Sequence, residues 1–402
     1  MKQFSGSVRV FTAFLALGLL AGCGSILRKP PPPAEAAEEL AVLGIPNARF
    51  WIDGQPDALI AEGRSMVVRD VATRPAGTPR PPTTFLAISG GADNGAFGAG
   101  LLTGWTAQGN RPVFNVVTGI SAGALIAPFA FLGSDYDPQL REVFTQVAPR
   151  DVLLLPRQVF AVFPLLFGEA LADTSPLARL INRHANQEML DAIAREYMRG
   201  RLLLVGTTNL DLQRPVVWNI GAIAASGHPE ALQLFRSILL ASASIPGAFP
   251  PVLVPVDYDG RSFEEMHVDG GAAMQVFLYP PSLPLRERVG ERERTAYVIR
   301  NGRINVEASA TSRGVFSIAR RSAATLLHFS GISDINRIYL TTQRDGVAFR
   351  LAFIGSEFQA DRREPFDPPF MQALFDYGYA LASQPWHTVP PGVSSTQAPA
   401  AR

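Results

Sequence analysis

The chain has 402 residues, of which 47% are hydrophobic and 18% charged, so it is long enough for one large or two modest globular domains. Its formal net charge is +1, so no overall charge favours nucleic acid or an acidic partner. It contains one cysteine, Cys23, which excludes an intrachain disulfide and a metal site with several cysteine ligands.

The first residues have the pattern of a secretory signal peptide. Basic residues precede an apolar run over residues 10–20, which is too short to span a bilayer as a mature helix. The run ends in Leu20-Ala21-Gly22-Cys23, which resembles the lipobox of bacterial lipoprotein signal peptides. The resemblance implies that residues 1–22 are removed and that Cys23 is lipidated and anchors the protein in a membrane of the cell envelope. Gly24 favours the outer over the inner membrane, with the domain facing the periplasm or the surface, and the alternative is a signal peptide with an incidental cysteine.

Residues 23–83 form a second segment, in which prolines are frequent. Residues 30–33 are consecutive prolines, and more prolines occur over residues 75–82. Because proline-rich chain is stiff and extended, we expect a tether that holds the domain off the membrane. Residues 45–71 contain enough apolar side chains to pack against the main body.

The main domain is expected over residues 84–385 and begins with a buried strand at residues 84–88. A glycine-rich turn follows, Gly90-Gly91-Ala92-Asp93-Asn94-Gly95, and then a helix over residues 96–105. Strand, glycine-rich turn and helix direct backbone N–H groups at an anion, which favours an oxyanion hole for a tetrahedral intermediate. One alternative is a nucleotide phosphate site, although the Gly-x-Gly-x-x-Gly spacing is absent, and another is that the glycines only let the helix pack on the sheet.

The next motif joins an apolar strand at residues 116–118 to a helix that runs to about residue 132. Between them lies Gly119-Ile120-Ser121-Ala122-Gly123, the Gly-x-Ser-x-Gly pattern of a nucleophile elbow. Such a turn holds its serine in a strained conformation at the positive end of a helix, and Gly119 and Gly123 let strand and helix pack without a Cβ clash. Ser121 is therefore the candidate nucleophile.

A helix is expected over residues 138–147, and an apolar stretch follows at residues 152–167. Prolines at positions 156 and 164 argue against a membrane span there. The stretch is either a buried, broken helix, which we favour, or an apolar lip over the active site that touches lipid.

Strands are expected at residues 202–210 and 214–219, followed by a helix over residues 231–243 that prolines terminate. A short strand at residues 266–268 leads into Asp269-Gly270-Gly271. An aspartate at a strand end before two glycines is either positioned to point into a cleft or a simple turn former.

The remaining elements are strands near residues 296–299 and 347–354 and helices near residues 315–329 and 370–381. Because strands alternate with helices, we expect an α/β fold with a mostly parallel sheet covered by helices on both faces. Residues 386–402 are expected to be a disordered tail.

A serine nucleophile needs a proton acceptor, and a histidine oriented by an aspartate is the familiar one. The five histidines, at positions 184, 228, 267, 328 and 387, have the settings of ordinary surface or core residues. Asp269 is framed by glycines and is the better candidate to accept the Ser121 proton directly. A carboxylate is a weak base at its ordinary pKa of about 3.9, and burial raises that pKa.

Three blocks together resemble the signature of patatin-like phospholipases: Gly90-Gly91-Ala92-Asp93-Asn94-Gly95, Gly119-Ile120-Ser121-Ala122-Gly123 and Asp269-Gly270-Gly271, in this order. The segment from Ser244-Ile245-Pro246 to Pro250-Pro251 resembles the proline-marked segment that precedes the aspartate in that family. The resemblance extends from about residue 84 to about residue 383.

This resemblance implies a Ser121–Asp269 dyad that releases fatty acid from a membrane lipid ester through an acyl-enzyme. It also implies oxyanion donors at Gly90, Gly91 and their neighbours, and no metal or organic cofactor. The chain departs from the family pattern at Ala92, where a third glycine is usual, and at Asn94, where an arginine is common. Alanine still supplies an N–H, and its Cβ leads us to expect a negative φ at that position.

The missing arginine leaves a preference for phosphate headgroups open. The two departures also motivate a second hypothesis, a non-catalytic lipid-binding envelope lipoprotein that keeps a hydrolase-like cleft. The lipid, the acyl position and the oligomeric state are left open by the sequence.

Overall fold

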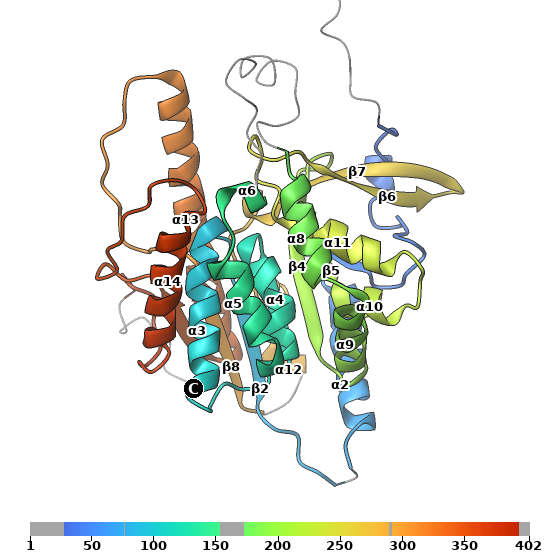
Figure 1. Cartoon of the computed structure of the whole chain (residues 1–402). Coiled ribbons are helices and arrows are strands. Elements are labelled where there is room, and N and C mark those ends of the chain that lie inside the picture. Colours follow the sequence, from blue (N-terminus) through green and yellow to red (C-terminus); the bar gives the residue numbers. More distant parts are fainter. Residues whose placement is uncertain (1–27, 76, 153–172, 289–291, 394–402) are drawn as a thin grey trace, which may run out of the picture.

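The computed structural model describes residues 28–75, 77–152, 173–288 and 292–393. Within these ranges nine strands form one sheet, in the order β1-β5-β4-β3-β2-β8-β9, and the β6–β7 hairpin joins it through β4 (Figure 1). The strands are β1 (Arg49–Trp51), β2 (Thr83–Ile88), β3 (Val116–Ile120), β4 (Leu202–Asn209), β5 (Arg214–Asn219), β6 (Val252–Tyr258), β7 (Arg261–Asp269), β8 (Arg294–Arg300) and β9 (Ala348–Phe353).

The five central strands, β4, β3, β2, β8 and β9, run parallel to one another. Every residue of β3 and β4 is buried, as expected for parallel strands that lie between two helical layers. Beyond β4 the pairing is antiparallel, to β5 and β7 and from them to β1 and β6. The expectation of an α/β fold with a mostly parallel sheet is confirmed.

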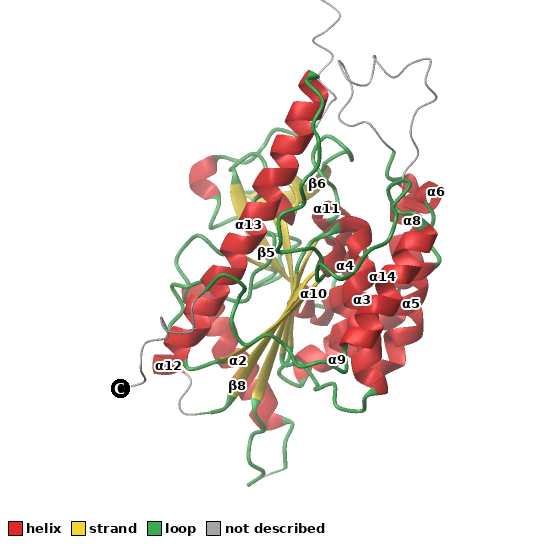
Figure 2. Ribbon diagram, turned by 90° about the vertical axis from the view of Figure 1, so that its left-hand side faces the viewer, coloured by secondary structure: helices red, strands yellow, loops and turns green. Residues whose placement is uncertain are grey.

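Helices cover both faces of this sheet (Figure 2). One face shares a hydrophobic core with α3, α4, α5, α11 and α14, and the other shares a second core with the C-terminal half of α13. The arrangement is a three-layer α/β/α sandwich. The helices are α2 (Asp57–Ala72), α3 (Gly95–Ala107), α4 (Ala122–Leu132), α5 (Asp137–Thr145), α6 (Pro149–Val152), α8 (Ser175–His184), α9 (Gln187–Met198), α10 (Ile220–Ala225), α11 (Ala231–Ser242), α12 (Leu285–Arg288), α13 (Val315–Asp345) and α14 (Pro368–Leu381).

Two elements are longer than the sequence predicts. The short strand expected at residues 266–268 is the end of β7, which pairs with β6 along its length. Pro255 within β6 is tolerated because β6 lies at the outer edge of the sheet. The helix expected to end at residue 329 continues past Gly331, which lies close to the Arg300 guanidinium, to Asp345 and ends at Gly346, which has φ 67°.

The C-terminal tail expected to be disordered from residue 386 begins on the domain instead. Trp386 packs against Trp105 with ring centroids 4.9 Å apart, and His387 forms an antiparallel bridge with Leu351. The prediction was wrong for these residues because a large aromatic side chain is stabilised by burial even next to a polar segment. Residues 394–402 lie outside the described residues, as do the predicted signal peptide, residues 1–22, and Cys23.

The N-terminal segment packs against the domain. β1 pairs with the edge strand β5, with Phe50 opposite Val217. The proline run expected to form part of a free tether lies along the β6–β7 hairpin, where the Lys29 N–H donates to the Glu264 carboxylate at 2.9 Å and the Glu264 N–H donates to the Pro30 carbonyl at 3.3 Å. A proline run lacks N–H donors but keeps its carbonyl acceptors, so it can still bind the hairpin edge.

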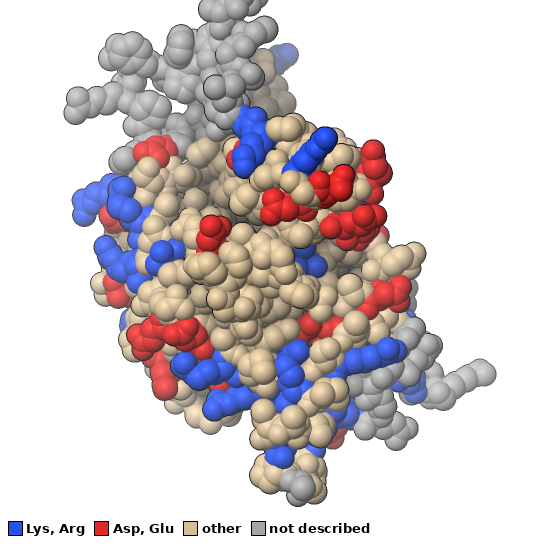
Figure 3. Space-filling view, turned by 90° about the vertical axis from the view of Figure 1, so that its right-hand side faces the viewer, with Lys and Arg blue, Asp and Glu red and all other residues tan. Residues whose placement is uncertain are grey.

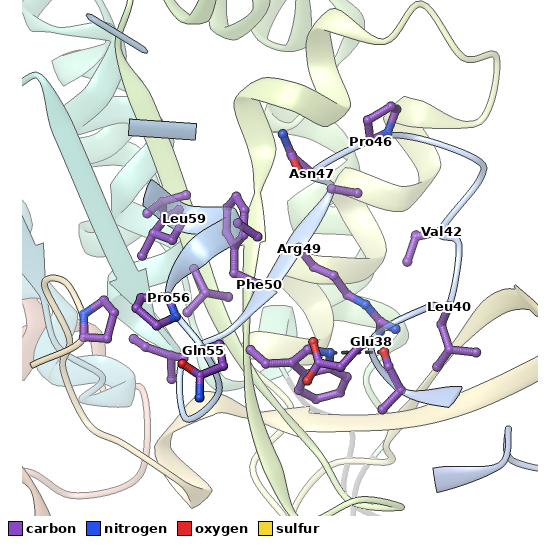
Figure 4. Close-up of a pocket in the computed structure, with 18 of the residues that line it drawn as sticks. Glu38, Leu40, Val42, Pro46, Asn47, Arg49, Phe50, Gln55, Pro56 and Leu59 are labelled. Carbon is purple, nitrogen blue, oxygen red and sulfur yellow. Dashed lines mark hydrogen bonds between the residues drawn. The ribbon is translucent and has the colours of Figure 1, made fainter. Parts of the chain in front are cut away.

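This segment also encloses a cavity of about 370 Å³ against β4, β5 and residues 277–280 (Figure 4). Leu40, Val42, Phe50 and Leu59 are among its apolar lining residues, and Ser121 is not part of it. On the side of the molecule shown in Figure 3, side chains of both charges surround a central uncharged area, in keeping with the small net charge.

In the part of the chain that the structure describes, no helix is both long and apolar enough to cross a membrane.

Candidate active site

The turn between β3 and α4 holds Ser121 at the C-terminal edge of the sheet. Ser121 has φ 56° and ψ −124°, a conformation that is strained for a residue with a Cβ and that agrees with the predicted elbow. Glycines flank it because a Cβ at Gly119 would lie 2.3 Å from the Gly123 carbonyl oxygen, and a Cβ at Gly123 would lie 2.2 Å from that of Ile88.

A buried serine from α11 fixes the backbone of this turn. The Ser121 N–H donates to Ser242 Oγ at 3.0 Å, and Ser242 Oγ donates to the Gly206 carbonyl at 2.6 Å. Both Ser121 and Ser242 are buried. The bond occupies the N–H of the nucleophile itself and anchors the strained turn to β4.

Asp269, at the end of β7, lies beside Ser121. Its carboxylate accepts a hydrogen bond from the Gly271 N–H at 2.7 Å, and the Ser121 hydroxyl is close enough to lower its pKa. The Asp269 N–H donates to the Ser244 carbonyl at 2.9 Å, so the proline-marked segment positions the aspartate backbone. Burial raises the pKa of Asp269 to about 6, although the Ser121 hydroxyl and the Gly271 N–H act in the opposite direction.

No histidine hydrogen-bonds to Ser121 or Asp269 within the described residues. His267, two residues before Asp269, is fully buried and contacts Thr207 Oγ1 and the Glu265 carboxylate, at 3.0 and 3.1 Å. The structure therefore brings the two predicted residues Ser121 and Asp269 together and places His267 in a separate buried network.

The glycine-rich turn divides into residues whose N–H groups are bonded and residues whose N–H groups are free. The Gly90 N–H donates to the Gln275 carbonyl at 3.1 Å, and the Asn94 N–H donates to the Gly91 carbonyl at 3.0 Å. The Gly95 N–H donates to the Ala92 carbonyl at the end of the short helical turn, so it too is occupied. These bonds remove Gly90, Asn94 and Gly95 from the set of available oxyanion donors.

The Asp93 side chain supports the turn from beneath. Its carboxylate is buried, and burial raises its pKa, while Arg362 pairs with it at 2.8 Å and the Phe366 N–H donates to it at 2.9 Å. Asp93 thus links the turn to the segment before α14.

Gly91 and Ala92 keep free N–H groups next to Ser121. Among the described residues neither N–H has a hydrogen-bond acceptor, and the same is true of the Ala122 N–H in the first turn of α4. Ala92 and Ala122 line the cavity that contains Ser121. These three groups are available to hold an oxyanion.

The negative φ expected at Ala92 was wrong, since Ala92 has φ 51°. Gly91 lies so close to Asn301 that a Cβ there would be 2.2 Å from the Asn301 carbonyl oxygen, and the chain must turn sharply after it. The left-handed conformation of an alanine costs about 1–2 kcal/mol, which the packed surroundings have to offset.

Asn301, which the sequence reading did not single out, holds the glycine-rich turn in place. Its N–H and its side-chain amide donate to the Ser89 hydroxyl and carbonyl, both at 2.8 Å, and its Oδ1 accepts from the Gly98 N–H at 3.0 Å. Asn301 is 1% exposed. The available signal was its position two residues after the strand predicted at residues 296–299, at the same sheet edge as Ser121.

The cavity at Ser121 is small, about 50 Å³, and mostly apolar. It is lined by Ala92, Ser121, Ala122, Leu125, Val143, Phe144, Val147, Val152, Leu177, Leu180, Ala243, Ile245, Phe249, Phe366 and Met371. A neighbouring cavity shares four of these side chains, Leu125, Val143, Leu177 and Leu180, and extends along α4, α8 and α9 to His184 and Met189. Residues 153–172, which include most of the apolar stretch predicted to be buried or to form a lip, lie outside the described residues.

The described residues contain no group of three or more His, Cys, Asp or Glu side chains that is arranged to hold a metal ion.

Residues 86–280, from β2 to beyond Asp269, match the family model of patatin-like phospholipases. The chain carries a patatin-like phospholipase domain. Among solved structures, it is similar to VipD from Legionella pneumophila, at 11% identity and a TM-score of 0.35, covering 76% of this chain and 67% of that one. It is also similar to human GIVD cytosolic phospholipase A2, at 12% identity and a TM-score of 0.30, covering 63% of this chain and about half of that one, 48%. A comparison with curated proteins gave no match. The patatin-like domain supports lipid hydrolysis as the general activity.

Proposed function

We propose that the patatin-like domain is a serine acyl hydrolase, of the phospholipase A or lipid esterase type, that releases fatty acids from membrane lipids. The observation that carries the proposal is that the buried Asp269 carboxylate lies beside Ser121, whose hydroxyl lowers the pKa of that carboxyl. The free N–H groups of Gly91 and Ala92 beside it supply the second requirement, a site for the negative charge of the intermediate.

In this proposal the Ser121 Oγ attacks the ester carbonyl carbon while its proton passes to Asp269. The N–H groups of Gly91, Ala92 and Ala122 stabilise the oxyanion of the tetrahedral intermediate. The intermediate collapses, the C–O bond to the alcohol breaks, and Asp269 returns the proton to the departing alcohol oxygen. Water then attacks the acyl-enzyme, giving its proton to Asp269, and the fatty acid leaves as Ser121 is restored.

The apolar side chains that line the cavity at Ser121 and its neighbour favour an acyl group as the part of the substrate bound there. The cavities measure about 50 and 30 Å³, so an acyl chain that extends through both would displace lining side chains. An acyl chain placed between α4, α5 and α8 would set its carboxyl end at Ser121. No charged side chain lines the cavity at Ser121 itself, so the acyl group, rather than a headgroup, is the part of the substrate that this cavity recognises.

The test of the chemistry uses two variants, Ser121→Ala and Asp269→Asn. Each is expected to lower hydrolysis of a short-chain nitrophenyl ester and of phospholipid by at least about a thousandfold, with an unchanged circular dichroism spectrum. Full activity in either folded variant would show that the dyad is wrong. A fluorophosphonate probe separates the enzyme from the non-catalytic lipid-binding alternative, because only an activated Ser121 forms the covalent adduct.

We also propose that Cys23 carries lipid and that the protein is anchored in the bacterial envelope, in the outer membrane by preference. The support is the Leu20-Ala21-Gly22-Cys23 motif after an apolar run. Cells fed an alkyne fatty acid are expected to label the protein, and Cys23→Ser is expected to abolish the label and release the protein from the membrane fraction. Labelling of the Cys23→Ser variant would contradict the anchor.

A further inference from the structure

The first half of α13 projects from the domain without packing on it. The helix is 31 residues long, and its first buried residue is Gly331, so residues 315–330 lie outside the core. At a rise of about 1.5 Å per residue this half measures about 24 Å. Figures 1 and 2 show it rising beyond the rest of the helical layers.

The projecting half lies at the catalytic end of the molecule. β8 runs parallel to β2 and β3, so the loop that follows β8 starts at the same sheet edge as Ser121 and leads to the first turn of α13. From there the helix descends beside the sheet to β9 (Figure 1). The exposed half of α13 and the opening at Ser121 therefore belong to one end of the sandwich.

One side of this half-helix is apolar. Val315, Phe316, Leu326 and Phe329 are 80%, 75%, 72% and 55% exposed, and Ile318 is 51% exposed. At 100° per residue these five side chains, with Leu327, occupy one half of the helix circumference, and Arg320, Arg321, Thr325 and His328 occupy the other. Large apolar side chains at this density on an exposed helix mark an interaction surface.

The charged side chains of the half-helix and its flanks are all positive. Residues 308–333 contain Arg313, Arg320 and Arg321 and no aspartate or glutamate. Within the described chain none of these three arginines is paired with a carboxylate in a salt bridge, and Arg321 donates to the backbone carbonyl of Glu307. An apolar face bordered by arginines and free of acidic residues is complementary to an anionic lipid surface, which offers acyl chains beneath negative headgroups.

We propose that the N-terminal half of α13, residues 313–329, docks on an anionic lipid surface, with Val315, Phe316, Leu326 and Phe329 inserted among the lipids and the arginines at the headgroups. Docking there presents membrane lipid to the Ser121 end of the domain. This inference deepens the proposed function, since it names the surface on which that activity takes place.

The test uses the full chain carrying Cys23→Ser, so that no attached lipid contributes to binding. Sedimentation is measured with vesicles of phosphatidylglycerol and phosphatidylcholine in equal amounts, and with vesicles of phosphatidylcholine alone. The docking variant is Phe316→Ser with Leu326→Ser, and the charge variant is Arg320→Gln with Arg321→Gln. The matched control is Val68→Ser with Val113→Ser, because those side chains are 67% and 72% exposed on other parts of the fold.

Binding to the anionic vesicles is expected to fall at least about tenfold in the docking variant and in the charge variant, and to stay unchanged in the control. Binding of the parent chain is expected to weaken as salt is raised. Unchanged binding in the docking variant would overturn the inference. A docking variant that becomes a smaller oligomer than its parent would also overturn it, since a second copy would then cover this face.

Activity assays keep the two proposals distinguishable. In the docking variant, hydrolysis of vesicle lipid is expected to fall about tenfold while hydrolysis of a soluble nitrophenyl ester is unchanged. Loss of vesicle hydrolysis together with soluble hydrolysis in this variant would contradict a docking role. If the parent chain hydrolyses neither substrate, the proposed function fails, and the sedimentation result still decides the docking proposal because binding needs no catalysis.

Discussion

Asp269 combines the two properties that a carboxylate base needs. Burial favours its neutral form and raises its pKa to about 6, which makes the ionised carboxylate a stronger base than an exposed one. The Ser121 hydroxyl and the Gly271 N–H stabilise the ionised form enough to keep it available near neutral pH. The basicity that we propose for Asp269 thus depends on burial, which raises its pKa, and on the two neighbouring groups, which lower it.

A pH dependence follows from this pKa. Only the ionised carboxylate accepts a proton, so kcat/KM for a soluble ester is expected to rise with pH through about 6, and to be about tenfold below its plateau at pH 5. Initial rates between pH 4.5 and 8.5 would measure it. His267→Gln is the control, and an inflection that disappears in that variant would assign the base to the histidine instead.

Ala92 departs from the family pattern but still supplies the backbone N–H that an oxyanion hole needs. An alanine at this position is compatible with the turn. Its φ of 51° shows that the turn forms with the alanine in a left-handed conformation. The backbone N–H remains free beside Ser121, so the side chain differs while the hydrogen-bond donor is kept.

At the scale of elements, a buried ion pair joins β1 to β7. Arg49 donates to both carboxylate oxygens of Glu265, which also contacts His267, and all three side chains are buried. Burial alone would raise the pKa of Glu265, but the hydrogen bonds and charges of His267 and Arg49 outweigh it and hold the pKa at about 2. The N-terminal strand is thereby held to the strand that ends in Asp269.

Removing one partner of this pair is expected to destabilise the domain. Arg49→Met leaves the Glu265 carboxylate buried without its cation, which costs about 3–5 kcal/mol of unfolding free energy. The double variant Arg49→Met with Glu265→Gln is expected to recover much of that loss because no charge is then left buried. Urea unfolding at neutral pH measures both, and a double variant no more stable than the single one would argue against the ion pair as the cause.

The acyl cavities make a prediction about chain length. Leu180, on α8, lines both cavities, so Leu180→Trp is expected to hinder an acyl chain that extends from one toward the other. Hydrolysis of a sixteen-carbon nitrophenyl ester should fall about tenfold relative to a four-carbon one. Leu232→Trp on α11 is the control, since Leu232 is half-buried and lines neither cavity. An unchanged chain-length preference would place the acyl chain elsewhere.

The elements that were predictable are those whose signal is local. A strand, a glycine-containing turn and a helix follow one another at residues 83–107 and 116–132, so these units and Ser121 were readable from neighbouring residues. The β6–β7 hairpin was missed because Pro255 interrupts the strand pattern, and its place at a sheet edge is not a local property. The full length of α13 was missed because a glycine at position 331 favours a helix end, whereas the helix continues past it beside the Arg300 guanidinium.

The candidate site was likewise predictable where its signal lies in neighbouring residues. Ser121 and Asp269 were identified because each stands at the end of a strand beside glycines. The roles of Gly91 and Ala92 among the six residues of their turn were not, because they depend on which N–H groups the distant Gln275 carbonyl and the folded turn itself occupy. Asn301 was missed for the same reason, since its partners lie about 200 residues away.

At the scale of the whole molecule, the region that matches the family model is completed by segments that precede and follow it in the chain. The family match ends at residue 280, yet Asn301 holds the glycine-rich turn and Phe366 and Met371 line the cavity at Ser121. On the other side, β1 extends the sheet before the match begins. The matched region therefore shares its core and its site with the rest of the described chain.

The contact of residues 28–33 with the β6–β7 hairpin determines which membrane surface would lie next to the Ser121 edge in a protein anchored at Cys23. Arg28 pairs at 2.6 Å with Asp211, which follows β4 at the same sheet edge as Ser121. Five peptide steps separate Cys23 from Arg28, a reach of at most about 18 Å. The lipid that we propose on Cys23 would then enter the bilayer next to the catalytic edge, and the enzyme would act on its own leaflet. Its rate would follow the surface density of lipid in that leaflet, and a second membrane brought alongside would be a poor substrate.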